Sequence, residues 1–256
     1  MDSANGDVPI AATPPFGAST SAYEAWARAE VGHWRAGLLK PEGGLGRAAR
    51  GVQGRINRLI PEQVHATVTS VVERMTRTIL TGANLTTAAP LQGADLAERD
   101  RRALAAIDGY RKTAAVEGGV TGAGGFWMAL ADFPALMVIK LKLLFDLSAI
   151  YGHDAEAFAE RLYLLQLFQL AFSGGGRRAD LLAAIEDWDA RPHPDDFAHF
   201  DWRRFQIEYR DHIDLAKLAQ MIPLVGAPVG AVVNWRLTER LGETAMNGYR
   251  MRWLAR

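Results

Sequence analysis

A glycine-rich, apolar stretch in the middle of the chain, residues 114–151, limits the possible folds more than any other segment. It holds five glycines, beginning at Gly118, and the missing side chains allow two backbones to approach closely there. Gly118 and Gly122 are four residues apart, so on a helix they lie on one face. Gly226 and Gly230 repeat this spacing near the C-terminus. We therefore expect these two small-residue faces to meet across one helix–helix interface.

Three charged residues, Glu117, Asp132 and Lys140, lie in or beside this apolar stretch. A buried charge is costly unless it is paired and hydrogen-bonded, so we expect Asp132 to be satisfied in one of two ways. Asp132 precedes Pro134 and can cap the helix that follows, or a cation such as Lys140 can pair with it. Glu117 and Asp132 are also a pair of carboxylates, which acid–base catalysis or a metal site would use. The sequence leaves their separation open, and we favour the structural role for Asp132.

The remaining sequence predicts an all-α fold. No segment shows sustained period-two alternation, and helix caps recur about every 20 to 30 residues. We expect one multi-helix domain over residues 19–256, with about eight to ten helices and a central, apolar, glycine-rich helical hairpin. Residues 1–18 combine prolines with scattered Ala, Gly and Thr, and are predicted to form a disordered N-terminal arm.

Capping signals place individual helices. Ser21 and the glutamate three residues later form a capping box, which predicts a helix that ends at about residue 39. A further helix is expected over about residues 62–81, because a proline immediately before it suits a first turn. Asp95 is predicted to cap the helix that leads into the glycine cluster. Asp154 is predicted to cap the next helix, which is apolar on almost every side and is therefore buried in a core or in lipid.

Composition narrows the function classes. Lys and Arg total 29 and Asp and Glu total 29, and this zero net charge argues against a nucleic-acid partner. The chain has no cysteine, which excludes thiol chemistry and favours a reducing compartment. The N-terminus lacks the pattern of a signal peptide, so a cytoplasmic location is expected. The longest uncharged runs fall short of the roughly 20 apolar residues of a membrane span, which predicts a soluble or peripheral protein.

Short motifs do not add a catalytic, cofactor-binding or metal-binding residue to the prediction. The glycine cluster lacks the spacing of a phosphate-binding loop. His153 and Asp154 resemble the dyad of metal phosphohydrolases, but a cationic histidine at a helix end is the interpretation we prefer. Near the C-terminus, Arg250 and Arg252 stand among tryptophans, which predicts either a membrane-surface helix or arginines in solvent above a Trp-lined core.

The chain contains the motif Glu117–Gly122, then Asp132–Pro134 and Tyr151–Gly152, and near the C-terminus the segment Ile222–Asn234. In this order these segments resemble the two signatures of the EcsC protein family. The likeness covers roughly residues 96–253, and separate motifs in the same order are more specific than any single motif. With Lys140 added, the candidate functional or structural residues are Glu117, Gly118, Gly122, Asp132, Pro134, Lys140, Tyr151, Gly152, Pro223, Gly226, Gly230 and Asn234.

The resemblance implies a bacterial, mainly helical protein whose namesake is encoded beside an ABC transporter linked to secretion. We therefore predict a non-enzymatic, membrane-associated or lipid-handling accessory protein at the inner face of the cytoplasmic membrane. Its expected partners are a membrane surface or lipid acyl chains, with an ABC transporter subunit as a further candidate. Two alternatives stay open: a metal-dependent hydrolase that uses Glu117, Asp132 and a histidine, and a structural partner of a transporter subunit.

Overall fold

A computed structural model describes residues 13–40, 62–81, 88–123, 126–173, 177–196, 198 and 226–256. Those residues form seven α-helices and a short 3-10 helix, with no strand among them, which confirms the all-α fold. The elements are α1 (Thr20–Leu39), α3 (Glu62–Thr81), α4 (Leu96–Ala123), α5 (Phe126–Ile150), α6 (Phe158–Phe172), α7 (Arg178–Glu186), η2 (Trp188–Ala190) and α10 (Gly226–Leu254). The total of eight to ten helices and the glycine-rich hairpin stay predictions, because the connecting segments lie outside the described residues.

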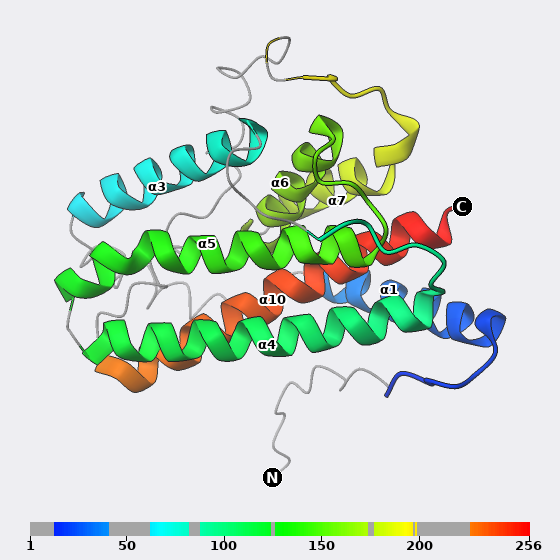
Figure 1. The fold of residues 1–256 in the computed structure, drawn as a ribbon, viewed down its shortest axis with the longest axis horizontal. Coiled ribbons are helices and arrows are strands. Elements are labelled where there is room, and N and C mark those ends of the chain that lie inside the picture. The colour runs from blue at the N-terminus through cyan, green and yellow to red at the C-terminus, as the bar shows by residue number, and fades with distance from the viewer. Residues whose placement is uncertain are drawn as a thin grey trace.

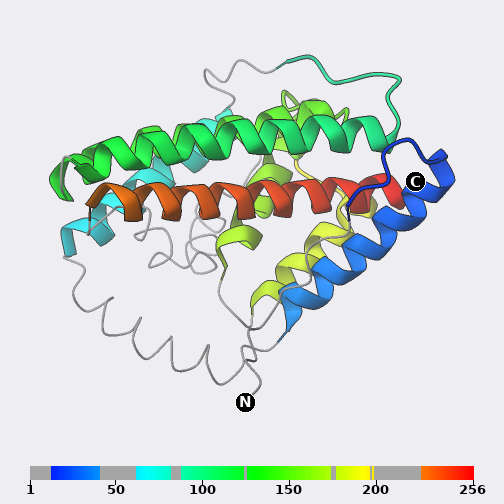
Figure 2. The same cartoon turned by 90° about the horizontal axis from the view of Figure 1, so that it is seen from below.

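Three long helices, α4, α5 and α10, lie side by side along the long axis of the molecule (Figures 1 and 2). Neighbours α4 and α5 run in opposite directions, and α10 runs antiparallel to α4. The shorter α1, α6 and α7 gather around the C-terminal half of α10, while α3 packs against α5 and α6. The end where α4 stops and α5 and α10 begin therefore carries few of the short helices (left side of Figure 1).

The helix limits follow local chemistry, with two corrections to the predicted caps. The cap of α1 is Ser19, whose hydroxyl accepts from the Ala22 amide, two residues before the predicted Ser21. Asp95 caps α4 as predicted, since its Oδ1 accepts from the Glu98 amide at 2.9 Å. Asp154 does not cap α6, because its carboxylate accepts from Glu156 in the preceding turn at 2.8 Å. The predicted limits of α3 are confirmed.

The apolar helix predicted beyond residue 154 is α6, which lies in the protein core. Helices α3, α5, α7 and α10 pack around it. Because most of its surface faces these helices, apolar residues occur on almost every side of α6. Tyr163, Phe168 and Phe172 are fully buried there. Among the described residues, no helix combines the length and apolar character needed to cross a bilayer.

The first described residues, 13–18, belong to the segment predicted as a disordered N-terminal arm, and they contact the helices. Phe16 lies in a turn and stacks on Tyr23 with ring centroids 5.8 Å apart, and the Arg101 guanidinium also lies over the Phe16 ring. This apolar contact orders residues 13–18 against α1 and α4. The rest of the predicted arm, residues 1–12, lies outside the described residues.

The two glycine-spaced faces meet, as predicted, where α4 crosses α10. A Cβ atom on Gly118 would lie 2.7 Å from the Gly230 carbonyl oxygen and 2.7 Å from Asn234 Nδ2. Such distances are far below van der Waals contact, so only glycine permits this approach. Gly122 and Gly226 continue the same helices, but their surroundings lie outside the described residues.

Two glycines of α4 give a matched test of this contact. We expect Gly118→Ala to lower the free energy of unfolding by about 1–3 kcal/mol, because a backbone carbonyl must move to admit the new methyl group. Gly109→Ala should raise stability by about 0.5–1 kcal/mol, since nothing lies within 4 Å of its Cβ position and alanine favours the helix. Urea unfolding of both variants measures this, and equal changes would contradict the close contact.

Candidate functional site

Several polar side chains of α10 are buried, and three of them contact three different neighbouring helices. Asn234 contacts α5, Arg250 contacts α4, and Tyr249 contacts α6. Buried polar groups normally require partners, so these contacts show which residues hold the helices in register. Two of the residues predicted from the sequence, Lys140 and Asn234, take part in these contacts. A third, Tyr151, donates to Asp100, the carboxylate that pairs with Arg250.

Lys140 and Asn234 form the contact between α5 and α10 near the glycine crossing. Lys140 is fully buried, and its Nζ donates to Asn234 Oδ1 at 3.2 Å. The Asn234 amide nitrogen in turn donates to the Gly230 carbonyl at 3.2 Å. Burial lowers the pKa of Lys140 from 10.5 to about 7, so near neutral pH the amine gives up its proton readily.

Asp100 is a fully buried carboxylate that joins four helices. Its Oδ2 accepts from the Tyr23 hydroxyl at 2.8 Å and from Arg250 Nε at 3.0 Å, and its Oδ1 accepts from the Tyr151 hydroxyl. Burial, reinforced by the Asp100 charge, raises the pKa of Tyr23 and of Tyr151, so both hydroxyls keep their protons and remain donors. The ion pair with Arg250 offsets the cost of burying the carboxylate.

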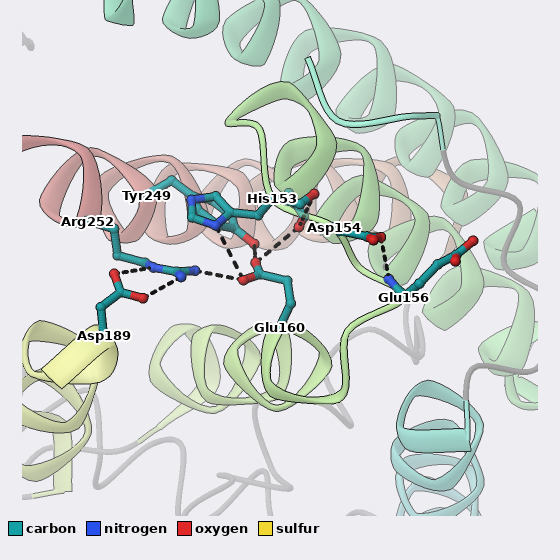
Figure 3. Close-up of polar contacts among 8 residues, drawn as sticks. His153, Asp154, Glu156, Glu160, Asp189, Tyr249 and Arg252 are labelled. Carbon is teal, nitrogen blue, oxygen red and sulfur yellow. Dashed lines mark hydrogen bonds and ion pairs between the residues drawn. The ribbon is translucent and has the colours of Figure 1, made fainter. Parts of the chain in front are cut away.

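Glu160 of α6 is the centre of the second buried carboxylate cluster (Figure 3). Its Oε1 accepts from Ser148 Oγ at 3.0 Å and from the Tyr249 hydroxyl. Its Oε2 accepts from Arg252 at 2.7 Å, and the same guanidinium binds both oxygens of Asp189 at 2.6 and 2.9 Å. Both carboxylate oxygens of Glu160 are therefore occupied, which fits a structural connection among α5, α6, α10 and η2.

His153 lies beside this cluster but is not the cationic helix-end group predicted. Its Nδ1 is 3.6 Å from Glu160 Oε2, yet burial lowers the pKa of His153 to about 4 despite the opposing effect of that carboxylate. The imidazole is therefore neutral at pH 7. The cation at the end of α5 is Arg99, which donates to the carbonyls of Ile150 at 2.7 Å and Leu91 at 3.0 Å.

Tyr151 and Gly152 of the predicted signature close α5. Gly152 has φ of +87°, a left-handed conformation that glycine adopts without strain. A Cβ there would also lie 2.9 Å from the Arg99 guanidinium. The turn thus brings the Tyr151 hydroxyl to Asp100 and leaves room for Arg99. Tyr151 and Gly152 therefore both have a structural role.

Asp132 fulfils neither of the two roles predicted for it. Helix α5 begins at Phe126, so Asp132 lies inside the helix and cannot cap it, and Pro134 also lies within the helix. Lys140 follows Asp132 by eight residues, or about 12 Å along the axis, and it donates to Asn234 instead. Asp132 is half-buried, and no described residue bonds its carboxylate.

Glu117 and Asp132 are not brought together as the hydrolase alternative requires. Tyr110 donates to Asp146 at 2.6 Å, which aligns these two levels of the antiparallel α4 and α5. Glu117 therefore lies opposite about residue 139, and Asp132 is about 10 Å further along the axis. Across the described ranges, no three His, Cys, Asp or Glu side chains are grouped as a metal site. Pro223 lies outside those ranges.

Sequence reasoning missed the buried carboxylates and misread one arginine. Asp100 follows Glu98 and precedes two arginines, a pattern that is usual on a solvated helix face. Arg250, predicted to lie in solvent or at a membrane surface, is buried. The one usable signal is the helical period: Arg250 is four residues after Met246, so both lie on a side of α10 that faces the core.

The fold and these contacts define an all-α protein whose long C-terminal helix is fixed by a glycine crossing and buried ion pairs. The EcsC protein family model matches residues 26–254. Protein EcsC of Bacillus subtilis (strain 168) is 42% identical over 226 residues, which cover 88% of this chain and 94% of that protein. The chain belongs to the EcsC protein family.

A second relative matches a shorter region. The uncharacterized protein YdbA of Bacillus subtilis (strain 168) is 30% identical over 141 residues, covering 54% of this chain and 52% of that protein. No solved structure matches the chain. The family match begins at residue 26, well N-terminal to the signatures seen in the sequence, so it includes most of α1 but not Tyr23.

The Asp100 cluster gives a direct stability test. We expect Asp100→Asn to lower the free energy of unfolding by about 3–5 kcal/mol, because it leaves the Arg250 charge buried without a counter-charge. The control is Asp195→Asn in an exposed loop, which should change stability by less than about 0.5 kcal/mol. Urea denaturation measures both. A small loss for Asp100→Asn would show that the pair contributes little.

Lys140 should give the protein a distinctive pH dependence. Between pH 7 and 10.5 the unfolded chain binds a proton that folded Lys140 has released, so stability rises with pH across this window. The full effect is on the order of 4 kcal/mol, and Lys140→Met should remove it. Urea unfolding at pH 7 and pH 9.5 measures the rise, with Lys142→Met, a partly exposed lysine two residues away, as control. An undiminished rise in Lys140→Met would contradict the depressed pKa.

Proposed function

We propose that the chain is a non-enzymatic, membrane-associated accessory protein that contacts a lipid bilayer through one apolar end. The observation that supports this is a group of exposed valines. Of the large apolar side chains described as exposed, four are more than half exposed, and all four are valines: Val116 at 68%, Val120 at 57%, Val138 at 54% and Val232 at 51%. A soluble surface tolerates single exposed valines, but a group indicates a contact surface.

The four valines lie at one end of the molecule, which we call the valine end. Gly118 contacts Gly230 across antiparallel helices, so Val116 is level with Val232. The hydrogen bond from Tyr110 of α4 to Asp146 of α5 aligns these two antiparallel helices. Val116 is therefore level with about residue 140 of α5, which is within one turn of Val138. Val120 is one turn closer to the end of α4. This is the left end in Figure 1.

The depth of these valines fits insertion into the interface of a bilayer. Val116 is seven residues from the end of α4 and Val232 is six residues from the start of α10, or about 10.5 Å and about 9 Å along the helix axes. Interfacial protein elements bury about 5–10 Å into a membrane.

The location and the protein partner belong to the same proposal. The absence of cysteine fits a reducing compartment, so we place the contact at the inner face of the cytoplasmic membrane. An ABC transporter subunit is the candidate protein partner, in line with the family resemblance. Lipid acyl chains at the valine end are the candidate ligand.

A fluorescent label tests the contact directly, because the chain has no native cysteine to interfere. We expect Val120→Cys, labelled with an environment-sensitive dye, to shift to the blue when neutral phosphatidylcholine vesicles are added. Labelled Leu104→Cys is the control, since Leu104 is exposed on the same helix but about 24 Å away. Equal shifts at both positions, or none at either, would contradict the proposal.

Co-sedimentation then measures the energetics of the valine end. Val116→Asp with Val232→Asp should weaken vesicle binding at least tenfold, because each valine loses about 1–2 kcal/mol of apolar burial. Leu104→Asp should bind as the unsubstituted protein does. Binding should persist at high salt, since apolar burial is not screened.

A further inference from the structure

Behind the exposed valines, each of the three long helices carries a cation and then an acid. The order is counted away from the valine end, in steps of three or four residues along one helical face. The members are Val116, Lys112 and Asp108 on α4; Val138, Lys142 and Asp146 on α5; and Val232, Arg236 and Glu239 on α10.

The order valine, cation, acid is the same in space for the three helices, but it is not the same along their sequences. Helix α4 runs towards the valine end, whereas α5 and α10 run away from it. The cation accordingly precedes its valine in α4 and follows it in the other two helices. A spatial layer of charge, and not a sequence repeat, accounts for this reversal.

The spacing of the layers matches the structure of a bilayer surface. Four residues of helix are about 6 Å along the axis, so the cations lie about 6 Å behind the valines. The headgroup layer is about 5–8 Å thick on each side of the hydrocarbon core. With the valines at the edge of the hydrocarbon, the cations lie at the depth of the lipid phosphates, and the acids lie further out in water.

We infer that Lys112, Lys142 and Arg236 form a basic collar that binds the phosphate groups of anionic phospholipids. This inference rests on the proposed function, because the valine end must enter the bilayer for the collar to reach the phosphates. Lys112 is 63% exposed and Lys142 is 34% exposed, and Arg236 is exposed. Long basic side chains of this kind extend towards an interface while their stems stay on apolar surface.

The collar acts at short range. Lys112 pairs with Asp108 and Lys142 pairs with Asp146, and Glu239 binds Arg111 of α4. No described acid pairs with Arg236, which makes it the freest of the three cations. Glu117 and Asp132 lie nearer the valine end and oppose long-range attraction, so the preference for anionic lipid develops only on contact.

The test compares binding to neutral phosphatidylcholine vesicles with binding to vesicles that contain anionic phosphatidylglycerol. We expect the protein to prefer the anionic vesicles. Lys112→Gln, Lys142→Gln and Arg236→Gln together should lower that preference by at least about fivefold, because each cation at an anionic surface contributes about that factor. Binding to neutral vesicles should stay unchanged.

The matched control removes three exposed cations at the opposite end, with Arg101→Gln, Arg102→Gln and Arg256→Gln. It changes the net charge equally and should keep the anionic preference. A further variant, Asp132→Asn, should strengthen anionic binding, since it removes a half-buried carboxylate near the valine end. Circular dichroism melting checks that each variant is folded.

The outcomes separate the inference from the proposed function. If the collar variant and the control lose the preference equally, or if neither loses it, the collar is overturned while membrane contact stands. Failure to bind either vesicle overturns the membrane contact itself. Light scattering that shows a dimer disrupted by Val116→Asp with Val232→Asp would assign the valine end to a second copy of the chain instead.

Discussion

The buried pair between Asp100 and Arg250 is the contact on which the arrangement of the helices depends most. A fully buried carboxylate destabilises the fold unless its charge and its oxygen atoms are satisfied, and here three side chains from three other helices do so. Tyr23 fixes α1, Tyr151 fixes the end of α5, and Arg250 fixes α10. Moving any one of these helices would leave a polar group buried without a partner, so the pair selects one arrangement among similarly apolar ones.

The glycine crossing and the ion pair act together because they lie far apart along the same two helices. Gly118 meets Gly230 near one end of the α4–α10 contact, and Asp100 meets Arg250 near the other. A slip of one turn between α4 and α10 would separate both contacts at once and would push side chains into Gly230. The register is thus fixed by sterics at one end and by charge at the other, which is a stronger constraint than either alone.

The sequence was informative where the cause of a feature is local. Capping patterns predicted α3 and the Asp95 cap correctly. Glycines with the same four-residue spacing in two distant segments predicted the contact between Gly118 and Gly230. It failed where the cause is distant: the partner of Arg250 lies 150 residues away, and 29 acidic residues are available to choose from. Asp132 was misjudged because a proline was read as a helix start, although α5 continues through it.

The same distribution of contacts explains how one end of the molecule can carry an exposed apolar surface without losing its fold. At the valine end, α4, α5 and α10 are held by Gly118, Lys140 and Asn234, all buried behind the surface. The exposed valines and the collar cations contribute little to these interior contacts, and surface positions of this kind usually tolerate substitution. The surface is therefore free to be shaped by what it binds, while the buried residues are required for the helices that present it.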